Sequence, residues 1–327
     1  MSEVRVDPLT GLKTIIAADR AARQGGARLQ APPPEPVDAA ADPFLEGHEH
    51  ETPPEVHAVR PGSGEPDGPG WTLRVVPNRY PALDPGAPEP PAEANRDLFT
   101  AQPATGAHEV IVHTPRPVGS LADLAPDELA AAVGVWRERL RAHAGAACRH
   151  LFVNEGRAAG ASLPHTHAQL YALPFVPALI ARERERFAAY AVRTMGANLL
   201  ADLVQEEVRR RERIVAIDDE AVLMAPYASI APFQLLLAPR RPRARFEDDG
   251  PAGAALLHDA LQRLRRRLGA SPPLNLWVRT APQGADVFCW RIDVVPRLVQ
   301  PAGLEVGSGV YLCELPPEQA AAELRSA

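Results

Sequence analysis

Two histidines one residue apart, His165 and His167, lie in the stretch NEGRAAGASLPHTHAQLYALP at residues 154–174. On a strand, alternate side chains face the same way, so both imidazoles and the side chain of Gln169 share one face. A neutral imidazole has a free lone pair near pH 7 and suits nucleophilic attack on phosphorus, provided that its other nitrogen donates to a fixed acceptor. Gln169 is a neutral donor that can hold a phosphoryl oxygen without giving a proton to a leaving group.

A turn rich in glycine precedes the histidines and contains Gly156, Gly160 and Ser162. Glycine lets backbone N–H groups approach an anion closely, and the serine hydroxyl adds another donor. These residues predict a phosphate cradle that faces the imidazoles. Two other interpretations are a metal site and an ordinary strand with two half-buried histidines. The ordinary strand fits the histidine spacing but leaves the glycine turn and the glutamine unexplained.

The surrounding sequence predicts the elements that position this motif. Ser120 and Pro126 mark the start of a helix whose apolar residues recur up to Leu140. Residues 31–70, rich in proline and glycine, are expected to form an extended loop, and residues 178–211 one long charged helix. Strands are expected at residues 13–17, 71–78, 108–115, 150–156, 167–174, 213–219, 221–228, 234–241, 274–282 and 289–297, with a further helix at 254–269. The order strand–strand–helix–strand–strand therefore occurs twice, which predicts an α+β fold of two similar units that share antiparallel sheets.

The composition excludes several classes of function. The 327 residues are 46% hydrophobic and have a formal net charge of −6, which gives no general electrostatic reason to bind nucleic acid or an anionic membrane. No apolar run approaches the roughly 20 residues of a membrane span, and the first residues lack the layout of a signal peptide. The three cysteines are far apart and include no CxxC pair, which is typical of a reducing compartment. We therefore expect a cytoplasmic protein.

The segment NEGRAAGASLPHTHAQ resembles the active-site signature of the galactose-1-phosphate uridylyltransferases, the transferase branch of the histidine-triad superfamily. Further similar segments follow the family order: DPLTGLKTIIAADRAAR, DPFLEGHEHETPPEV, VVPNRYPAL, HEVIVHTPRPVGSLADL and VVPRLVQPAGLEVGSGVYLCELPPEQAAAELR. The resemblance implies a duplicated histidine-triad-like fold, with an N-terminal unit at residues 1–195 that includes the loop 31–70 and a C-terminal unit at 196–327. It also implies a homodimer with active sites shared between subunits.

The resemblance further implies a ping-pong reaction. His167 would attack the α-phosphorus of a nucleotide-sugar, which gives a nucleotidyl-histidine and a sugar 1-phosphate, and a second sugar 1-phosphate would then take the nucleotide. Gln169 would contact the phosphoryl group in place of the last histidine of the hydrolase branch, which favours transfer over hydrolysis. The remaining residues that the resemblance places at phosphate-binding or nucleotide-binding positions are Asn154, Gly160, Ser162, His165, Arg20, Arg23 and Asn78.

The metal sites of the family are not matched in this sequence. Many members bind zinc through a Cys-x-x-Cys pair, a histidine after the VIV strand and the first histidine of the signature. The corresponding residues here are Asp42, Leu45, Pro117 and His165. One imidazole and one carboxylate fall short of the four ligands of a structural zinc site, and the spacing of His48, His50 and His113 supports no replacement.

The second metal site of the family is similarly depleted. Glu183 aligns with one ligand, but the C-terminal hairpin presents Arg279, Arg291 and Asp293 where histidines are expected. We therefore expect no metal, and an ion pair of Arg291 with Asp293 or with Glu183 in its place.

The acceptor side leaves three hypotheses open. The segment GLEVGSGVYL at residues 303–312 has no counterpart of the basic residue that binds sugar phosphate in the uridylyltransferases, and is more similar to a subgroup that includes nucleotide-sugar phosphorylases. The first hypothesis is a UDP-glucose–hexose-1-phosphate uridylyltransferase of galactose metabolism. The second is an ADP-sugar or dinucleoside-polyphosphate phosphorylase with the same histidine nucleophile. The third is a nucleotide-binding or scaffold homologue without catalysis.

Overall fold

A ten-stranded sheet forms the centre of the computed structural model, which describes residues 2–23, 29–90 and 98–327. Its strands follow the order β3-β4-β5-β7-β6-β11-β12-β10-β9-β8, and every neighbouring pair is antiparallel. The strands are β3 (His57–Val59), β4 (Leu73–Pro77), β5 (Ala107–Val112), β6 (Cys148–Glu155), β7 (His167–Leu173), β8 (Ile214–Ile217), β9 (Ala221–Met224), β10 (Leu235–Pro239), β11 (Leu274–Arg279) and β12 (Arg291–Pro296).

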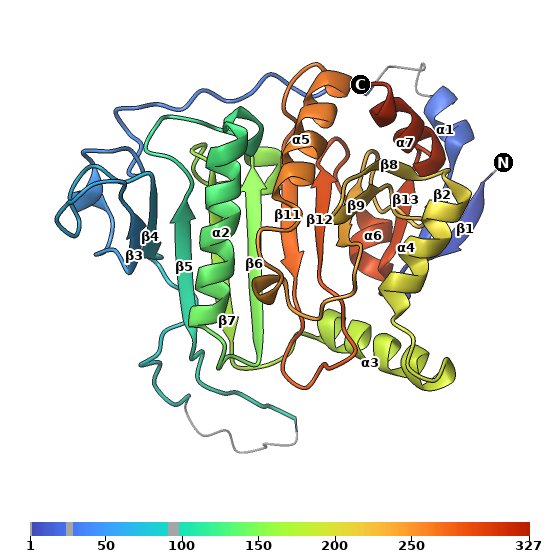
Figure 1. The fold of residues 1–327 in the computed structure, drawn as a ribbon, viewed down its shortest axis with the longest axis horizontal. Coiled ribbons are helices and arrows are strands. Elements are labelled where there is room, and N and C mark those ends of the chain that lie inside the picture. Colours follow the sequence, from blue (N-terminus) through green and yellow to red (C-terminus); the bar gives the residue numbers. More distant parts are fainter. Residues whose placement is uncertain (1, 24–28, 91–97) are drawn as a thin grey trace.

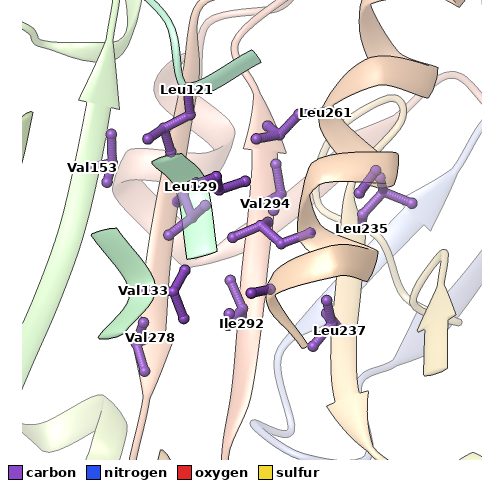
Figure 2. Close-up of a cluster of buried hydrophobic side chains, with 14 of the residues drawn as sticks. Leu121, Leu129, Val133, Val153, Leu235, Leu237, Leu261, Val278, Ile292 and Val294 are labelled. Atoms are coloured by element: carbon purple, nitrogen blue, oxygen red, sulfur yellow. The ribbon is translucent and has the colours of Figure 1, made fainter. Parts of the chain in front are cut away.

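Two helices, α2 (Pro126–Ala142) and α5 (Ala254–Leu268), cover one face of this sheet and lie side by side (Figure 1). Their apolar stripes pack on the inward residues of the strands, and the largest buried cluster of the described residues lies between the two layers. Figure 2 shows Leu129 and Val133 of α2 pointing toward Val278, Ile292 and Val294 of the strands. By alternation with the buried Ala168, Leu170, Ile292 and Val294, the side chains of His167, Gln169, Arg291 and Asp293 lie on the face turned away from α2 and α5.

The two halves of the chain repeat one topology. Strands β4-β5-β7-β6 and strands β9-β10-β12-β11 have the same order around α2 and α5, and the pairing of β6 with β11 joins them into one sheet. This arrangement confirms the predicted α+β fold with a duplicated strand order and antiparallel sheets flanked by helices. The predicted boundary between residues 195 and 196 falls in a turn, and the division into two domains there stays a prediction.

The long helix expected over residues 178–211 is wrong in one respect, since two helices occupy this segment. Helix α3 (Ala178–Arg193) ends before Met195 and Gly196, which both have positive φ, of 57° and 109°. The side chain of Asn198 then accepts from two backbone N–H groups and caps α4 (Leu199–Arg210). Glycine adopts the left-handed conformation without strain, so Gly196 and Asn198 end one helix and begin the next.

A three-stranded sheet formed by both ends of the chain lies beside the large sheet. Strand β2 (Lys13–Ile16) pairs with β1 (Glu3–Val6) in antiparallel and with β13 (Val310–Cys313) in parallel orientation. Helices α1 (Ala18–Arg23), α6 (Gly303–Ser308) and α7 (Pro317–Arg325) complete this region. Of the helices in the described residues, none is long and apolar enough to span a bilayer. The three cysteines are buried free thiols.

The loop at residues 31–70 is mostly irregular, as predicted, but it also contributes the edge strand β3 and a short 3-10 helix (Glu49–Glu51). Polar contacts fix it to the sheet. Arg74 of β4 donates to Glu55 at 3.1 Å and to Asp67 at 2.9 Å, and the indole N–H of Trp71 donates to Glu49 at 2.8 Å. These bonds, rather than proline alone, hold the loop against β4, which β5 separates from the histidine-bearing β7.

Candidate active site

The ring of His167 is held in one tautomer at the start of β7. Its Nδ1 lies 2.8 Å from the carbonyl oxygen of His165, and because a carbonyl only accepts, Nδ1 carries the proton and Nε2 is bare. Burial lowers the pKa of His167 by disfavouring the imidazolium, although the bond to His165 opposes this. The side chain is therefore a neutral base with a free lone pair, as nucleophilic attack requires.

The ring of His165 is held by hydrogen bonds, one of them to the loop 31–70, and so it is not free to act as a nucleophile. Its Nδ1 lies 2.6 Å from Asp42 Oδ2, and its Nε2 lies 2.9 Å from the carbonyl oxygen of Thr114. Both ring nitrogens are thus engaged, and the pair is buried. The same carboxylate accepts the backbone N–H of Phe44 at 3.0 Å, and the ring of Phe44 lies 5.2 Å from that of His167 and 6.0 Å from that of His165. Contact of one ring with both imidazoles agrees with their predicted common face.

The reverse side of the His-Thr-His motif is held by a buried chain of hydrogen bonds. The indole of Trp136 donates to His113 Nε2 at 3.1 Å, so His113 donates from Nδ1 to the hydroxyl of Thr166, also at 3.1 Å. Thr166 in turn donates to Glu155 at 3.2 Å. Burial raises the pKa of Glu155 to about 7. Burial is also the largest of the causes that lower the pKa of His113 well below its ordinary value. Both nitrogens of His113 are used, so this residue does not serve as the substitute metal ligand considered above.

The side chains of Gln169 and Asn78 both contact His108, a residue that was not among the predicted site residues. The Nε2 atom of His108 is 3.0 Å from Gln169 Oε1 and 3.2 Å from Asn78 Nδ2. His108 is on β5, whose Val112 pairs with His167 and whose Val110 pairs with Gln169. The signal that could have found it is the alternation along residues 108–112, which places His108 on the face that Gln169 shares.

The glycine turn has a different role from the one predicted. The N–H groups of Ala159 and Ala161 donate to the carbonyl of Gly156, and that of Gly160 donates to the carbonyl of Arg157. These donors are therefore used inside the turn and are not offered to an anion. Gly156 and Gly160 are needed for their positive φ of 75° and 85°. The exposed Ser162 remains a candidate phosphate donor.

Asn154, at the end of β6, is fixed across the junction of the two units. Its Oδ1 accepts from Asn275 Nδ2 of β11 at 2.8 Å, and the same amide donates to the carbonyl of Ala159 in the glycine turn. The contact leaves the Asn154 Nδ2 group oriented away from β11 and toward the turn, where an added Cβ on Gly160 would lie 4.0 Å from it. Asn275, which the sequence analysis did not select, therefore orients a predicted phosphate-binding residue.

The two arginines predicted near the nucleotide are not brought to His167 within one chain. Arg20 is exposed on α1, where it pairs with Glu314 at 3.2 Å. Arg23 ends the same helix, and its side chain lies outside the described residues. Figure 1 shows α1 beside α7 and β2, across the molecule from β5 and β7. That Arg20 and Arg23 lie near the nucleotide, in a site shared between subunits, stays a prediction.

The depleted second metal site is an ion cluster, as hypothesised. Arg291 Nη1 and Nη2 donate to the two oxygens of Glu183, at 3.1 and 3.2 Å, and its Nε donates to Asp293 at 2.9 Å. Arg279 Nε lies 3.3 Å from Glu183 Oε2. Two guanidinium groups against two carboxylates do not fit a metal cation. Of the described residues, no three histidine, cysteine or acidic side chains form a group suited to a metal. The absence of a resident metal stays a prediction, and elemental analysis of the purified protein tests it.

A further histidine on the face turned away from α2 and α5, His150 of β6, predicts a pH-dependent stability. Burial and then the charge of Arg279 lower the pKa of His150 to about 4, against 6.5 for an ordinary histidine. Between about pH 6.5 and pH 4, the unfolded chain binds a proton at His150 that the folded chain does not bind. The free energy of unfolding is therefore unaffected by this group above pH 6.5 and falls as the pH falls toward 4. At about 1.4 kcal/mol per pKa unit, the loss is at most about 3.5 kcal/mol.

Urea denaturation at pH 7 and at pH 5 measures this effect. We expect His150→Gln to lose less unfolding free energy between the two pH values than the unmodified protein. His258→Gln, on the helix layer, controls for the loss of a histidine as such. An equal pH dependence in the unmodified protein and in His150→Gln contradicts the prediction.

Comparison with known proteins places the chain in a family. The model of the galactose-1-phosphate uridyl transferase N-terminal domain matches residues 1–177. The ADP-glucose phosphorylase of Arabidopsis thaliana is 28% identical, over 99% of this chain and 92% of that protein. The galactose-1-phosphate uridylyltransferase of Haemophilus influenzae is 30% identical, over 77% of this chain and 76% of that protein.

Solved structures agree with this placement. The crystal structure of the Arabidopsis thaliana ADP-glucose phosphorylase with bound ADP-glucose has a TM-score of 0.79 and 26% identity, and the alignment covers 100% of this chain and 99% of that one. A uridylyltransferase structure has a TM-score of 0.76 and 26% identity, with 100% and 98% covered. The chain therefore belongs to the galactose-1-phosphate uridyl transferase family and is an enzyme of the nucleotidyltransferase type.

Proposed function

We propose that this chain transfers a nucleotidyl group from a nucleotide-sugar through a covalent intermediate on His167. The observation that carries the proposal is the hydrogen bond from His167 Nδ1 to the carbonyl of His165, which leaves Nε2 bare beside Gln169. In the first half-reaction Nε2 bonds to the α-phosphorus, and the bond from that phosphorus to the bridging oxygen breaks. The leaving sugar 1-phosphate takes the electron pair, and Gln169 donates to a phosphoryl oxygen as charge develops on it.

In the second half-reaction an oxygen of the acceptor attacks the same phosphorus and the bond to His167 breaks. A sugar 1-phosphate as acceptor yields a new nucleotide-sugar, whereas inorganic phosphate yields a nucleoside diphosphate. Neither Gln169 nor His167 supplies an acidic proton to the leaving group. Either acceptor is compatible with this, because a phosphate leaving group is stable as an anion. The motif thus supports transfer, and the acceptor is a separate question.

Two finer activities are candidates. The first is the uridylyl transfer from UDP-glucose to a hexose 1-phosphate that the sequence motif suggests. The second is phosphorolysis of ADP-glucose, which is supported by the similarity to ADP-glucose phosphorylase over 99% of this chain. The segment 303–312, which forms α6 and most of β13, contains no lysine or arginine that could hold a sugar phosphate. That composition and the wider coverage favour the phosphorylase.

We further propose that the enzyme acts as a homodimer. Arg20 is exposed on α1, far from β7 of its own chain, and so it can serve a nucleotide only in the site of a second copy. This agrees with the shared sites that the family resemblance implies.

Brief incubation with ADP-glucose and, separately, with UDP-glucose, followed by intact-protein mass measurement, tests the proposal. We expect an adenylyl adduct, or a uridylyl adduct if the uridylyltransferase activity holds, and release of glucose 1-phosphate in equal amount. Addition of inorganic phosphate or of galactose 1-phosphate to the isolated adduct then identifies the acceptor from the product. Absence of an adduct with both donors and with dinucleoside polyphosphates would favour the non-catalytic homologue.

A further inference from the structure

The nucleophile motif does not by itself decide which end of the Gln169 amide faces the substrate. A carboxamide can turn its oxygen or its nitrogen toward a ligand, and only the nitrogen can donate to a phosphoryl oxygen. We propose that His108 is a positioning residue that fixes the Gln169 amide with its N–H groups toward the substrate. This inference rests on the proposed function for its catalytic consequence, but the contact itself is independent of it.

The contacts of the His108 ring select one tautomer. The backbone N–H of Ala82 points at Nδ1 from 3.3 Å, so Nδ1 accepts and the ring proton lies on Nε2. That Nε2–H then donates to Gln169 Oε1 at 3.0 Å. The ring is held in plane by stacking on Tyr171, with centroids 4.0 Å apart and an interplanar angle of 30°. His108 is buried, and burial lowers its pKa, which keeps the imidazole neutral with a single N–H.

The opposite tautomer satisfies fewer contacts. It would allow Asn78 Nδ2, 3.2 Å away, to donate to a bare Nε2. It would also set Nδ1–H against the N–H of Ala82 and leave Gln169 Oε1 facing a lone pair. The tautomer with the proton on Nδ1 therefore has two repulsive contacts. The tautomer with the proton on Nε2 has one, against Asn78 Nδ2, and so it is favoured. The orientation of Asn78 is set separately, because its Oδ1 accepts the backbone N–H of Tyr80 at 2.8 Å.

His108 affects the substrate through its hydrogen bond to Gln169. With Oε1 bonded to His108, the Gln169 Nε2 amide group has no hydrogen-bond partner within the part of the chain that the structure describes. Gln169 is half-buried and sits two residues after His167 on the same strand face. Loss of the His108 donor would free the amide to rotate, and its oxygen would then repel the phosphoryl group in part of the molecules.

Two substitutions separate the donor from the ring. His108→Phe keeps a ring to stack on Tyr171 but removes the N–H, whereas His108→Gln replaces the ring and retains an amide N–H at a similar reach. Single-turnover adduct formation with the productive nucleotide-sugar gives the rate, and titration calorimetry with the slowly reacting Gln169→Ala and His108→Phe proteins gives the donor affinity. We expect His108→Phe to lower the rate at least about 10-fold, with donor affinity changed less than about threefold, and His108→Gln to restore most of the rate.

The double variant tests whether His108 acts through Gln169. In a Gln169→Ala background, His108→Phe should have no further effect on the rate, because the group that it orients is gone. Equal losses in both backgrounds, or a wild-type rate in His108→Phe, would overturn the inference.

A measurement without catalysis keeps this result distinct from failure of the proposed function. Nitrogen-15 correlation spectra of the histidine rings at pH 7 should show His108 as the Nε2–H tautomer, with a shift that Gln169→Ala moves and Arg210→Ala does not. A proton on Nδ1 would overturn the inference even if no nucleotide-sugar reacts. Absence of an adduct together with the Nε2–H tautomer would reject the proposed function alone.

Discussion

The variant His167→Ala is expected to lose nucleotidyl transfer by at least about 10⁴-fold, which corresponds to about 5.4 kcal/mol of transition-state free energy. The atom that bonds to phosphorus is removed, and no neighbouring imidazole can replace it. Both nitrogens of His165 are engaged by Asp42 and Thr114, and both nitrogens of His113 are engaged inside the core. Steady-state rates and intact-protein mass measure the effect, and we expect no adduct.

His167→Asn provides the matched control for this loss. Its side-chain amide can donate to the carbonyl of His165 as Nδ1 does, but it has no nucleophilic atom at the position of Nε2. It should therefore be as inactive as His167→Ala while retaining more of the thermal stability, since alanine leaves a cavity beside the ring of Phe44. Activity near that of the unmodified protein in either variant would rule out His167 as the nucleophile.

Much of the fold follows from patterns that are local in sequence. Apolar alternation and proline positions locate the strands on either side of α2 and α5, and the repeated order of elements predicts the duplication that the sheet order confirms. The error at residues 194–198 arose because helical periodicity continues across the break. The left-handed Gly196 and the cap on Asn198 are short-range signals that compete with that periodicity, and they prevail here.

The site was predictable where its chemistry lies in one segment and unpredictable where it depends on pairing between strands. His167, Gln169 and Asn154 follow from a single motif, but His108 reaches Gln169 only because β5 lies beside β7. The glycine turn shows the opposite limit. Its composition suggested donors for an anion, yet whether an N–H faces a ligand or its own turn depends on φ and ψ, and residue type alone does not give these.

The duplication also explains where the ion cluster lies. Strand β12 of the second unit occupies the place that β7 occupies in the first, and it presents Arg291 and Asp293 at the spacing of His167 and Gln169. One copy of the strand thus carries the candidate nucleophile, and the other carries a buried ion pair that ties α3 to the sheet through Glu183. Equivalent positions of the two units are therefore expected to contribute to reactivity in one unit and to stability in the other.

Arg291→Ala is accordingly expected to destabilise the protein by about 3–5 kcal/mol, the usual cost of removing one partner from a buried ion pair. Burial alone would raise the pKa of Glu183, but Arg291 and Arg279 hold it below its ordinary value. Without Arg291, two buried carboxylates share the charge of Arg279 alone. Urea denaturation measures the free energy of unfolding. Arg210→Ala, which breaks an exposed pair with Glu206, should leave the free energy of unfolding nearly unchanged.

A second comparison tests the origin of the loss. Arg291→Lys keeps the charge but cannot contact Glu183 with two parallel N–H groups and Asp293 with a third, so we expect an intermediate destabilisation. Arg291→Met combined with Asp293→Asn removes one charge of each sign, leaves Glu183 paired with Arg279, and should recover much of the stability lost in Arg291→Ala. If Arg291→Ala unfolds at the same urea concentration as the unmodified protein, the cluster does not tie α3 to the sheet. If this double variant is no more stable than Arg291→Ala, packing of the arginine side chain, rather than uncompensated charge, accounts for the loss.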